Sequence, residues 1–287
     1  MTKPTAREVL LYSDVERSVE QIDAMEAQFF NQVVLRNGTH KTTSTKRLTE
    51  IDNMLVDLIQ SSGVANSGPI RVVDMGVSSG VTTAELVQSL NDNGVTHKLD
   101  AFDLCVDASI VSYSPQFHVL EDSNGWPLQF EFFGRSEENT LGVTLFRKLK
   151  RVLPIFTLRV LRGLFALIVR RPERRDVKLI SKHLRDVENV NIFEYDLANI
   201  NQLDKKYDVV RAANILNRAY FDDEFLSQSV AKIRGVMVED GLFCVVRTHE
   251  AGVNHGAIYR LTNGQFVEQT IFGDGSEIDF LIRPANS

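Results

Sequence analysis

The chain contains the run Ile70-Arg71-Val72-Val73-Asp74-Met75-Gly76-Val77-Ser78-Ser79-Gly80-Val81-Thr82-Thr83-Ala84-Glu85-Leu86-Val87-Gln88-Ser89-Leu90. It begins with apolar and β-branched residues, passes through glycine and serine, and continues with apolar side chains at helical spacing. This pattern predicts a strand, a tight turn and a helix. Because the first N–H groups of a helix have no partner within the helix, such a junction suits a polar or anionic ligand.

The composition is that of an acidic protein with enough apolar residues for a full core. The chain has 287 residues, of which 43% are hydrophobic, and a formal net charge of -6. This length allows one large domain or two smaller ones. A general nucleic-acid binder is expected to be basic, so we expect no nucleic-acid partner. The N-terminus lacks the apolar core of a secretory signal, which favours a cytoplasmic protein.

The two cysteines, Cys105 and Cys244, lie far apart in the sequence, and neither belongs to a Cys/His cluster with metal-ligand spacing. We expect both to be buried as small apolar residues in a reduced protein. We expect no metal site.

The N-terminal part of the chain is expected to be helical. Apolar residues at helical spacing predict a helix over about 5–34 that ends at Asn37-Gly38, and a second helix over about 48–61. The polar, basic stretch 39–47 between them is either a solvated loop or a segment that folds over a ligand. We expect residues 1–62 to form a helical cap before a domain of residues 63–287.

From Ile70 onward, strands alternate with helices. A second strand over 98–104 follows the first helix, and two strands joined by a helix predict a parallel pair. Further strands are expected at 190–197, 207–213 and 241–248, with helices at 177–185 and 222–238. Two alternating runs around Asn263-Gly264 predict an antiparallel hairpin over 257–272. The fold class is therefore α/β, a doubly wound and mostly parallel seven-stranded sheet with a C-terminal antiparallel hairpin.

An insertion over 105–175 interrupts this alternation. Its first part, 110–133, has β-like runs around Asp122-Ser123-Asn124-Gly125 and predicts a hairpin. Residues 139–172 contain eight basic side chains and no acidic one. Within them, 143–171 predicts an amphipathic helix with a wide apolar face and a cationic stripe. Such a helix either packs on its own domain as a lid or makes peripheral contact with the inner membrane surface.

Polar residues collect where the predicted parallel strands end. These ends hold Asp74, Asp103, Asp196, Arg211 and the segment 247–249, and ligands of such sheets bind at this rim. Acids and several amides at one rim suit a ligand with hydroxyl and amine donors better than a phosphate. No Walker lysine follows Gly80, and the spacing of the glycines departs from GxGxxG, so phosphate-loop and dinucleotide sites are excluded.

The order of these motifs resembles that of the class I S-adenosylmethionine-dependent methyltransferases over roughly residues 39–272. The run from Val72 to Gly80 is similar to the first motif of that family, with Ser78 where the family usually has glycine. Asp103 matches the acid that accepts hydrogen bonds from both ribose hydroxyls, and Asp196 matches the position that reads the adenine amino group. The stretch 208–217 is similar to the fourth motif, beside the sulfonium and the substrate.

The resemblance implies that the protein is a methyltransferase and that its cofactor is S-adenosyl-L-methionine. The residues implied to bind this cofactor are Asp74, Gly76, Ser78, Gly80, Asp103, Tyr195, Asp196, Leu197 and Arg211. The loop after the fourth motif would orient the acceptor through Asn214, Asn217 and Tyr220. No Asn/Asp-Pro-Pro-Tyr signature is present, which disfavours a nucleobase or a glutamine amide as acceptor. We expect a small-molecule acceptor, apolar or lipid-linked.

A general base would help if the acceptor is a hydroxyl or an amine. The first candidate is His249, at the end of the predicted strand 241–248, and the second is His255.

Two other classes of function remain open. Gly76-Val77-Ser78-Ser79-Gly80 also spells GxSxG, the nucleophile elbow of α/β-hydrolases, with a late histidine in the required order. Against a serine esterase, no HGG-type loop precedes the motif, and Asp74 would oppose a developing oxyanion. The third class is a non-catalytic module that docks on membranes through 143–171.

Overall fold

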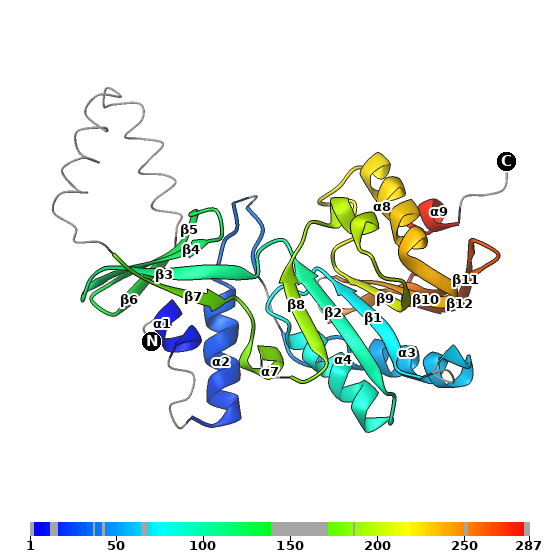
Figure 1. The fold of residues 1–287 in the computed structure, drawn as a ribbon, viewed down its shortest axis with the longest axis horizontal. Coiled ribbons are helices and arrows are strands. Elements are labelled where there is room, and N and C mark those ends of the chain that lie inside the picture. Colours follow the sequence, from blue (N-terminus) through cyan, green and yellow to red (C-terminus); the bar gives the residue numbers. More distant parts are fainter. Residues whose placement is uncertain are drawn as a thin grey trace. The chain divides into compact units, whose positions relative to one another are not determined.

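The structure is a computed structural model that describes residues 3–11, 17–36, 38–41, 44–64, 68–138, 172–185, 187–249 and 252–283 (Figure 1). Contacts divide the chain into two compact units. One comprises Met1–Thr43 and Asp107–Ile180, and the other comprises Ser44–Val106 and Ser181–Ser287. The predicted amphipathic helix 143–171 lies outside the described residues. Within the described part of the chain, no helix is long and apolar enough to cross a membrane.

The larger unit is built on a seven-stranded sheet with the order β12-β11-β10-β9-β1-β2-β8. Its strands are β1 (Ile70–Met75), β2 (His97–Asp103), β8 (Val190–Glu194), β9 (Tyr207–Ala213), β10 (Met237–Thr248), β11 (Asn254–Thr262) and β12 (Gln265–Phe272). The strands β8, β2, β1, β9 and β10 run parallel to one another, whereas β11 is antiparallel to β10 and β12 is antiparallel to β11. The predicted fold class is therefore confirmed.

Helices cover both faces of this sheet (Figure 1). The helices α3 (Thr49–Ser61) and α4 (Val81–Asp92) pack together on one face. The other face carries α8 (Asp223–Val236), the 3₁₀ helix η2 (Leu197–Gln202) and α9 (Asp279–Ile282). Alternate residues of the central strands pack with α8 and η2 in the main apolar core, and Val73, Met75 and Val210 are examples. Asp74 therefore belongs to the α3 and α4 face.

The smaller unit is a five-stranded antiparallel sheet packed with N-terminal helices. The strand order is β6-β5-β4-β3-β7, with β3 (Asp107–Ser114), β4 (Phe117–Asp122), β5 (Pro127–Phe132), β6 (Arg135–Glu138) and β7 (Glu173–Lys178). The helices are α1 (Ala6–Leu10) and α2 (Val19–Phe30). The Ala6 N–H donates to Gln129 Oε1 at 2.8 Å, and Arg7 pairs with the buried Glu131 at 3.2 Å. These bonds attach α1 to the inserted sheet.

Several sequence-based boundaries differ from the structure. The single helix predicted over 5–34 is two helices, because Thr5 and Ser18 each form a capping box that starts a new helix. The predicted hairpin is a five-stranded sheet. Residues 177 and 178, predicted to be helical, end β7 because they pair with β3, and the helix α7 covers only Lys182–Arg185. The first 43 residues group with the insertion rather than with α3, unlike the expected 1–62 cap.

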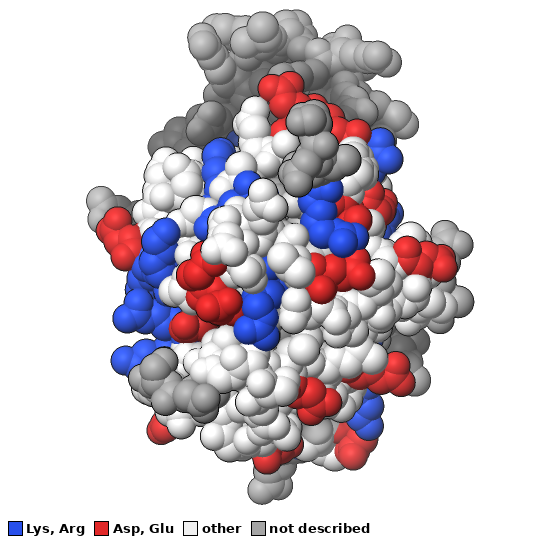
Figure 2. Space-filling view, turned by 90° about the vertical axis from the view of Figure 1, so that its right-hand side faces the viewer, with Lys and Arg blue, Asp and Glu red and all other residues white. Residues whose placement is uncertain are grey.

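The cysteine prediction is confirmed, since Cys105 and Cys244 are both buried and reduced. On the face shown in Figure 2, acidic and basic side chains are interspersed.

Candidate functional site

The turn between β1 and α4 has a positive φ angle at three positions. Gly76, Ser78 and Gly80 have φ angles of 70°, 55° and 82°. A Cβ atom at Gly76 would lie 2.6 Å from Ile215 Cδ1, and one at Gly80 would lie 2.5 Å from Leu184 Cδ2. Glycine is therefore required at both positions by close packing as well as by φ. Of these three residues, Ser78 is the one that has a side chain, and its backbone still adopts the left-handed conformation.

The N–H groups of this turn bond to the protein itself. Gly76 and Val77 donate to Phe102 O at 2.9 and 3.2 Å, and Gly80 donates to Val77 O at 2.8 Å. The Ser78 N–H donates to Asp103 Oδ2 at 2.7 Å. A phosphate cradle needs several such donors aimed at the ligand. This turn therefore suits a ligand that lies against its backbone, and it does not suit a phosphate.

Asp103 connects the turn to the end of β2. Its Oδ2 accepts from Ser78 N–H, and its Oδ1 accepts from the Cys105 N–H at 3.2 Å. A carboxylate can accept about four hydrogen bonds. Asp103 therefore holds the turn in place, and its carboxylate is the kind of acceptor that the ribose role requires.

The segment after β8 lies beside Asp103. The Tyr195 N–H donates to Asp103 O at 2.9 Å, and the Tyr195 ring packs edge-on against Phe102 at 5.6 Å. Asp196 is exposed and caps η2, since its Oδ1 accepts from Ala198 N–H at 2.9 Å. The Leu197 side chain belongs to the core. Of the three predicted adenine-side residues, Asp196 is thus the most accessible, and Leu197 can contribute only its backbone.

Asp74 and Arg211 form a buried ion cluster instead of facing the rim. Arg211 Nε lies 3.0 Å from Asp74 Oδ1, and Arg211 Nη2 lies 2.6 Å from Asp74 Oδ2. Arg211 Nη1 lies 2.6 Å from Asp52 Oδ1, and Nη2 also donates to Thr82 O. The Thr83 hydroxyl donates to Asp74. Because Asp74 and Arg211 are buried and bond each other, we assign both residues to holding β1, β9, α3 and α4 together, in correction of their predicted cofactor contacts.

Asp52 was missed in the sequence analysis. It lies on the buried face of α3, and its Oδ2 has no hydrogen-bond partner among the described residues. Burial raises the pKa of Asp52 to about 6, although the charge of Arg211 opposes this shift. The carboxylates of Asp52 and Asp74 raise the pKa of Arg211 and outweigh its desolvation. The sequence signal for this buried cluster is the position of Asp52, an acid within the apolar stripe of α3.

The loop after β9 is held by its own asparagines. The Thr248 N–H donates to Asn214 Oδ1 at 2.7 Å, and Asn214 Nδ2 donates to Thr248 Oγ1 at 3.4 Å. Asn217 is buried, and its Nδ2 donates to Asn214 O at 2.8 Å. Tyr220 is 63% exposed. Among the three predicted acceptor residues, the two asparagines therefore fix the loop, and only Tyr220 presents its side chain outward.

The polar stretch before α3 is tied to the same rim. Asn254 Nδ2 donates to Arg47 O at 2.7 Å, and Thr248 Oγ1 donates to Asn254 Oδ1 at 2.9 Å. Burial, together with the nearby Arg211, lowers the pKa of Arg47. The end of this stretch is thus bound to the sheet rather than fully solvated.

His249 and His255 line one cavity at the carboxyl end of β10. The cavity has a volume of about 380 Å³. Its lining residues are Leu216, Val245, Arg247, His249, His255, Asp274, Gly275, Ser276 and Glu277. The two imidazole rings meet edge to face, with centroids 4.6 Å apart. The structure therefore brings together both histidines that were predicted as bases.

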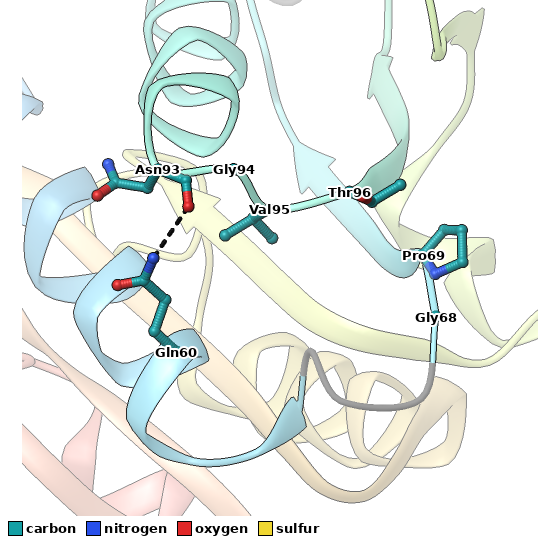
Figure 3. A pocket seen from close by; sticks show the side chains of 7 residues that line it. All are labelled: Gln60, Gly68, Pro69, Asn93, Gly94, Val95 and Thr96. Atoms are coloured by element: carbon teal, nitrogen blue, oxygen red, sulfur yellow. Dashed lines mark hydrogen bonds between the residues drawn. The ribbon is translucent and has the colours of Figure 1, made fainter.

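A second cavity of about 250 Å³ lies elsewhere (Figure 3). It is lined by Gln60, Gly68, Pro69 and residues 93–96, and Gln60 Nε2 donates to Asn93 O across it. These residues precede β1 and β2, so this cavity is at the amino ends of the strands. Ligands of parallel sheets bind at the opposite edge. Among the described residues, no group of three or more His, Cys, Asp or Glu side chains could hold a metal ion.

Comparisons with known proteins give matches only among solved structures. No family model matches the chain. No curated protein matches it either. An O-methyltransferase family protein from Burkholderia thailandensis is 14% identical with a TM-score of 0.31, over 70% of this chain and 39% of that one. A S-adenosylmethionine-dependent methyltransferase from Clostridium acetobutylicum is 11% identical with a TM-score of 0.32, over 72% and 51%.

The N-methyltransferase NodS from Bradyrhizobium japonicum, solved with S-adenosyl-l-homocysteine, is also 11% identical, with a TM-score of 0.31 over 72% of this chain and 65% of that one. All three are named as methyltransferases, the class that the sequence motifs resemble. The chain spans less than two thirds of the length of each. Similarity this low does not determine what a protein binds, so the strand order and the site residues are the basis for assigning a function.

Proposed function

We propose that the protein transfers a methyl group from S-adenosyl-L-methionine to a small-molecule acceptor. The observation that carries this proposal is the bond between the Ser78 N–H and Asp103 Oδ2, at 2.7 Å. It brings the glycine-rich turn after β1 and the acid at the end of β2 to one place at the carboxyl edge of a parallel sheet, where ligands of such folds bind. The cofactor supplies a methyl group already activated on a sulfonium.

The accessibility of the predicted site residues decides which of them we propose as cofactor contacts. Asp103 would accept the ribose hydroxyls, the exposed Asp196 would accept from the adenine amino group, and the backbone from Gly76 to Gly80 would lie along the remaining part. Ile215 packs over Gly76, so binding requires this side chain to adjust. The work of the protein is to align the reacting groups and to exclude water.

Titration calorimetry with S-adenosyl-L-methionine and S-adenosylhomocysteine tests the proposal. We expect micromolar binding to the wild-type protein and none to Asp103→Ala. Asp103→Asn keeps an oxygen that can accept from the Ser78 N–H. This variant therefore loses the negative charge without losing the hydrogen bond that holds the turn. Asp107→Asn, at the exposed start of β3, is the matched control and should bind normally. Unchanged affinity in Asp103→Ala would contradict the ribose assignment.

The acceptor is proposed on sequence grounds to be apolar or lipid-linked. The basic, apolar segment 143–171 motivates this choice and also motivates peripheral contact with the inner membrane surface. Flotation with anionic lipid vesicles tests the contact. The wild type should float, and a variant that lacks residues 145–169 should not. If neither protein floats, both the membrane contact and the proposal of a membrane-docking module are removed, and if both float, residues 145–169 do not make the contact.

One observation favours a serine hydrolase as a second candidate. Ser78 has a φ of 55° between a strand and a helix, as a nucleophile elbow does. The acid beside His255 is, however, the exposed Asp274, with 3.2 Å between Nδ1 and Oδ2. A fluorophosphonate probe should leave Ser78 unlabelled. Labelling of Ser78 without cofactor binding would reverse the choice.

A further inference from the structure

The loop after β9 borders both the cavity at the end of β10 and the glycine-rich turn. Leu216 lines the cavity, while the preceding residue, Ile215, packs over Gly76. The cavity therefore lies at the same carboxyl edge of the sheet as the turn where the methyl donor is proposed to bind, with one loop contacting both. Its volume of about 380 Å³ exceeds the roughly 150 Å³ that suffices for a benzene ring.

His255 is held in one orientation by the turn that follows β12. Its Nδ1 accepts from the Asp274 N–H at 2.8 Å. A Cβ atom at Gly273 would lie 2.9 Å from the same Nδ1, so the ring needs glycine there. The Asp274 carboxylate is also 3.2 Å from Nδ1, but this carboxylate is 94% exposed, so water competes with the imidazole for it. The backbone N–H of Asp274, in contrast, has a fixed position. The neutral ring is therefore assigned the tautomer with its hydrogen on Nε2, which makes His255 a donor.

His249 complements this donor. Its side chain is exposed at the rim, and its ring lies edge to face with that of His255 in the same cavity. A neutral imidazole has one nitrogen that accepts. The pair can therefore offer one hydrogen-bond donor and one proton acceptor to the same ligand atom.

We propose that this cavity is the acceptor site and that it selects a hydroxyl over an amine. This inference rests on the proposed methyl transfer. A hydroxyl oxygen has two lone pairs, so one accepts from His255 Nε2–H while the other attacks the methyl carbon. The neutral nitrogen of an amine has a single lone pair, and a bond to His255 would block its attack.

The methyl transfer forms one bond and breaks another. The oxygen lone pair forms the new O–C bond, the C–S bond breaks, and its electron pair stays on sulfur. The hydroxyl proton passes to His249 and then to water. His249, the first candidate from the sequence, is the base, and His255, the second candidate, instead positions the oxygen.

The charged residues that line the cavity further limit the chemical class of the acceptor. Arg247 is paired with Glu277, which also accepts from the Arg218 N–H. With Asp274 added, the cavity carries no excess of positive charge that would favour a carboxylate or a phosphate. Leu216 and Val245 give it an apolar floor. An uncharged alcohol with an aromatic or aliphatic body fits this lining, and a phenol is the simplest probe.

The test compares two probes of the same shape, 4-methylphenol and 4-methylaniline, both uncharged at neutral pH. With S-adenosylhomocysteine bound, we expect the phenol to bind about tenfold more tightly, the value of one hydrogen bond, because the nitrogen lone pair of an aromatic amine is delocalised into the ring and accepts poorly from His255. It should shift the Cε1–H signals of His249 and His255 in the NMR spectrum. Nitrogen-15 spectra should show the Nε2–H tautomer at His255. Equal affinity for the two probes, no binding of the phenol at millimolar concentration, or the other tautomer overturns the inference.

A variant shows whether His255 is the discriminating group. In His255→Phe, the preference for the phenol should fall to about twofold, while affinity for S-adenosylhomocysteine stays unchanged. His40→Gln, which removes an imidazole from the smaller unit, is the matched control and should keep the full preference. An unchanged preference in His255→Phe overturns the inference. Failure of the wild type to bind S-adenosylhomocysteine would instead contradict the proposed function.

Discussion

Replacing Arg211 with methionine removes the cation from the buried cluster while keeping a side chain of similar length. Arg211 is fully buried, bonds Asp74 through two nitrogens, and bonds Asp52 through a third. The variant leaves two buried carboxylates without their partner. We expect it to lower the free energy of unfolding by about 3–5 kcal/mol, the usual cost of breaking a buried ion pair.

The same cluster makes stability depend on pH through Asp52. The pKa of Asp52 is raised from 3.8 to about 6 in the folded protein. Between these values the folded state holds more protons than the unfolded state. The contribution of Asp52 to stability is therefore greatest below about pH 4 and falls by about 3 kcal/mol as the pH rises through about 6. Asp52→Asn keeps Oδ1 as an acceptor for Arg211 and should abolish this slope.

Hydrogen exchange of the β1 and β9 amides measures both effects inside the larger unit, independently of the smaller unit. Arg71→Met, at an exposed position of β1, is the control and should change the free energy of opening by less than about 0.5 kcal/mol. The reasoning is refuted if Arg211→Met costs less than about 1 kcal/mol, or if the wild type and Asp52→Asn share one pH profile.

Three further substitutions have expected outcomes. Gly76→Ala, at φ 70° and with its Cβ 2.6 Å from Ile215, should cost roughly 2 kcal/mol or more and should weaken cofactor binding, as measured by denaturation and calorimetry. Gly273→Ala should displace the His255 ring and shift its NMR signals while leaving cofactor affinity unchanged. Asp222→Ala removes the N-cap of α8, which accepts from the Phe225 N–H at 2.8 Å, and should cost about 1 kcal/mol in thermal unfolding.

The larger unit was predictable because its elements carry local signals. Asn263 and Gly264 have φ angles of 52° and 72°, the positive values that a two-residue hairpin turn of Asn-Gly adopts. The β1 to α4 junction matches its prediction, since glycine is favoured wherever φ is positive or the backbone is closely approached. In such elements, neighbours in sequence determine the local conformation.

The smaller unit was not predicted because its sheet depends on distant pairing. β3 pairs with β7, whose residues follow about sixty positions later, and no local turn specifies this partner. The attachment of α1 through Gln129 and Glu131 is equally non-local. The division of one helix into α1 and α2 was readable, however, because Thr5 to Glu8 and Ser18 to Gln21 have capping-box spacing.

The position of Asp74 in the first motif led to a wrong prediction of where its side chain lies. Asp74 stands one residue before the end of β1, where a strand-end acid is expected to face the ligand. Its neighbours Val73 and Met75 point into the main core, so alternation sends Asp74 to the α3 and α4 face. There, register places it opposite Arg211 on β9.

The sequence held a stronger signal for this pairing than the motif itself. Asp74 and Arg211 each interrupt an apolar strand, and Asp52 interrupts the apolar stripe of α3. A charge in a buried element requires a partner of opposite sign. Arg211 is the charged residue of opposite sign in these positions, so its pairing with the two acids could have been predicted. Asp103 differs because it ends its strand half-buried beside the turn, and this difference in burial, rather than the motif, makes it the residue to test for cofactor binding.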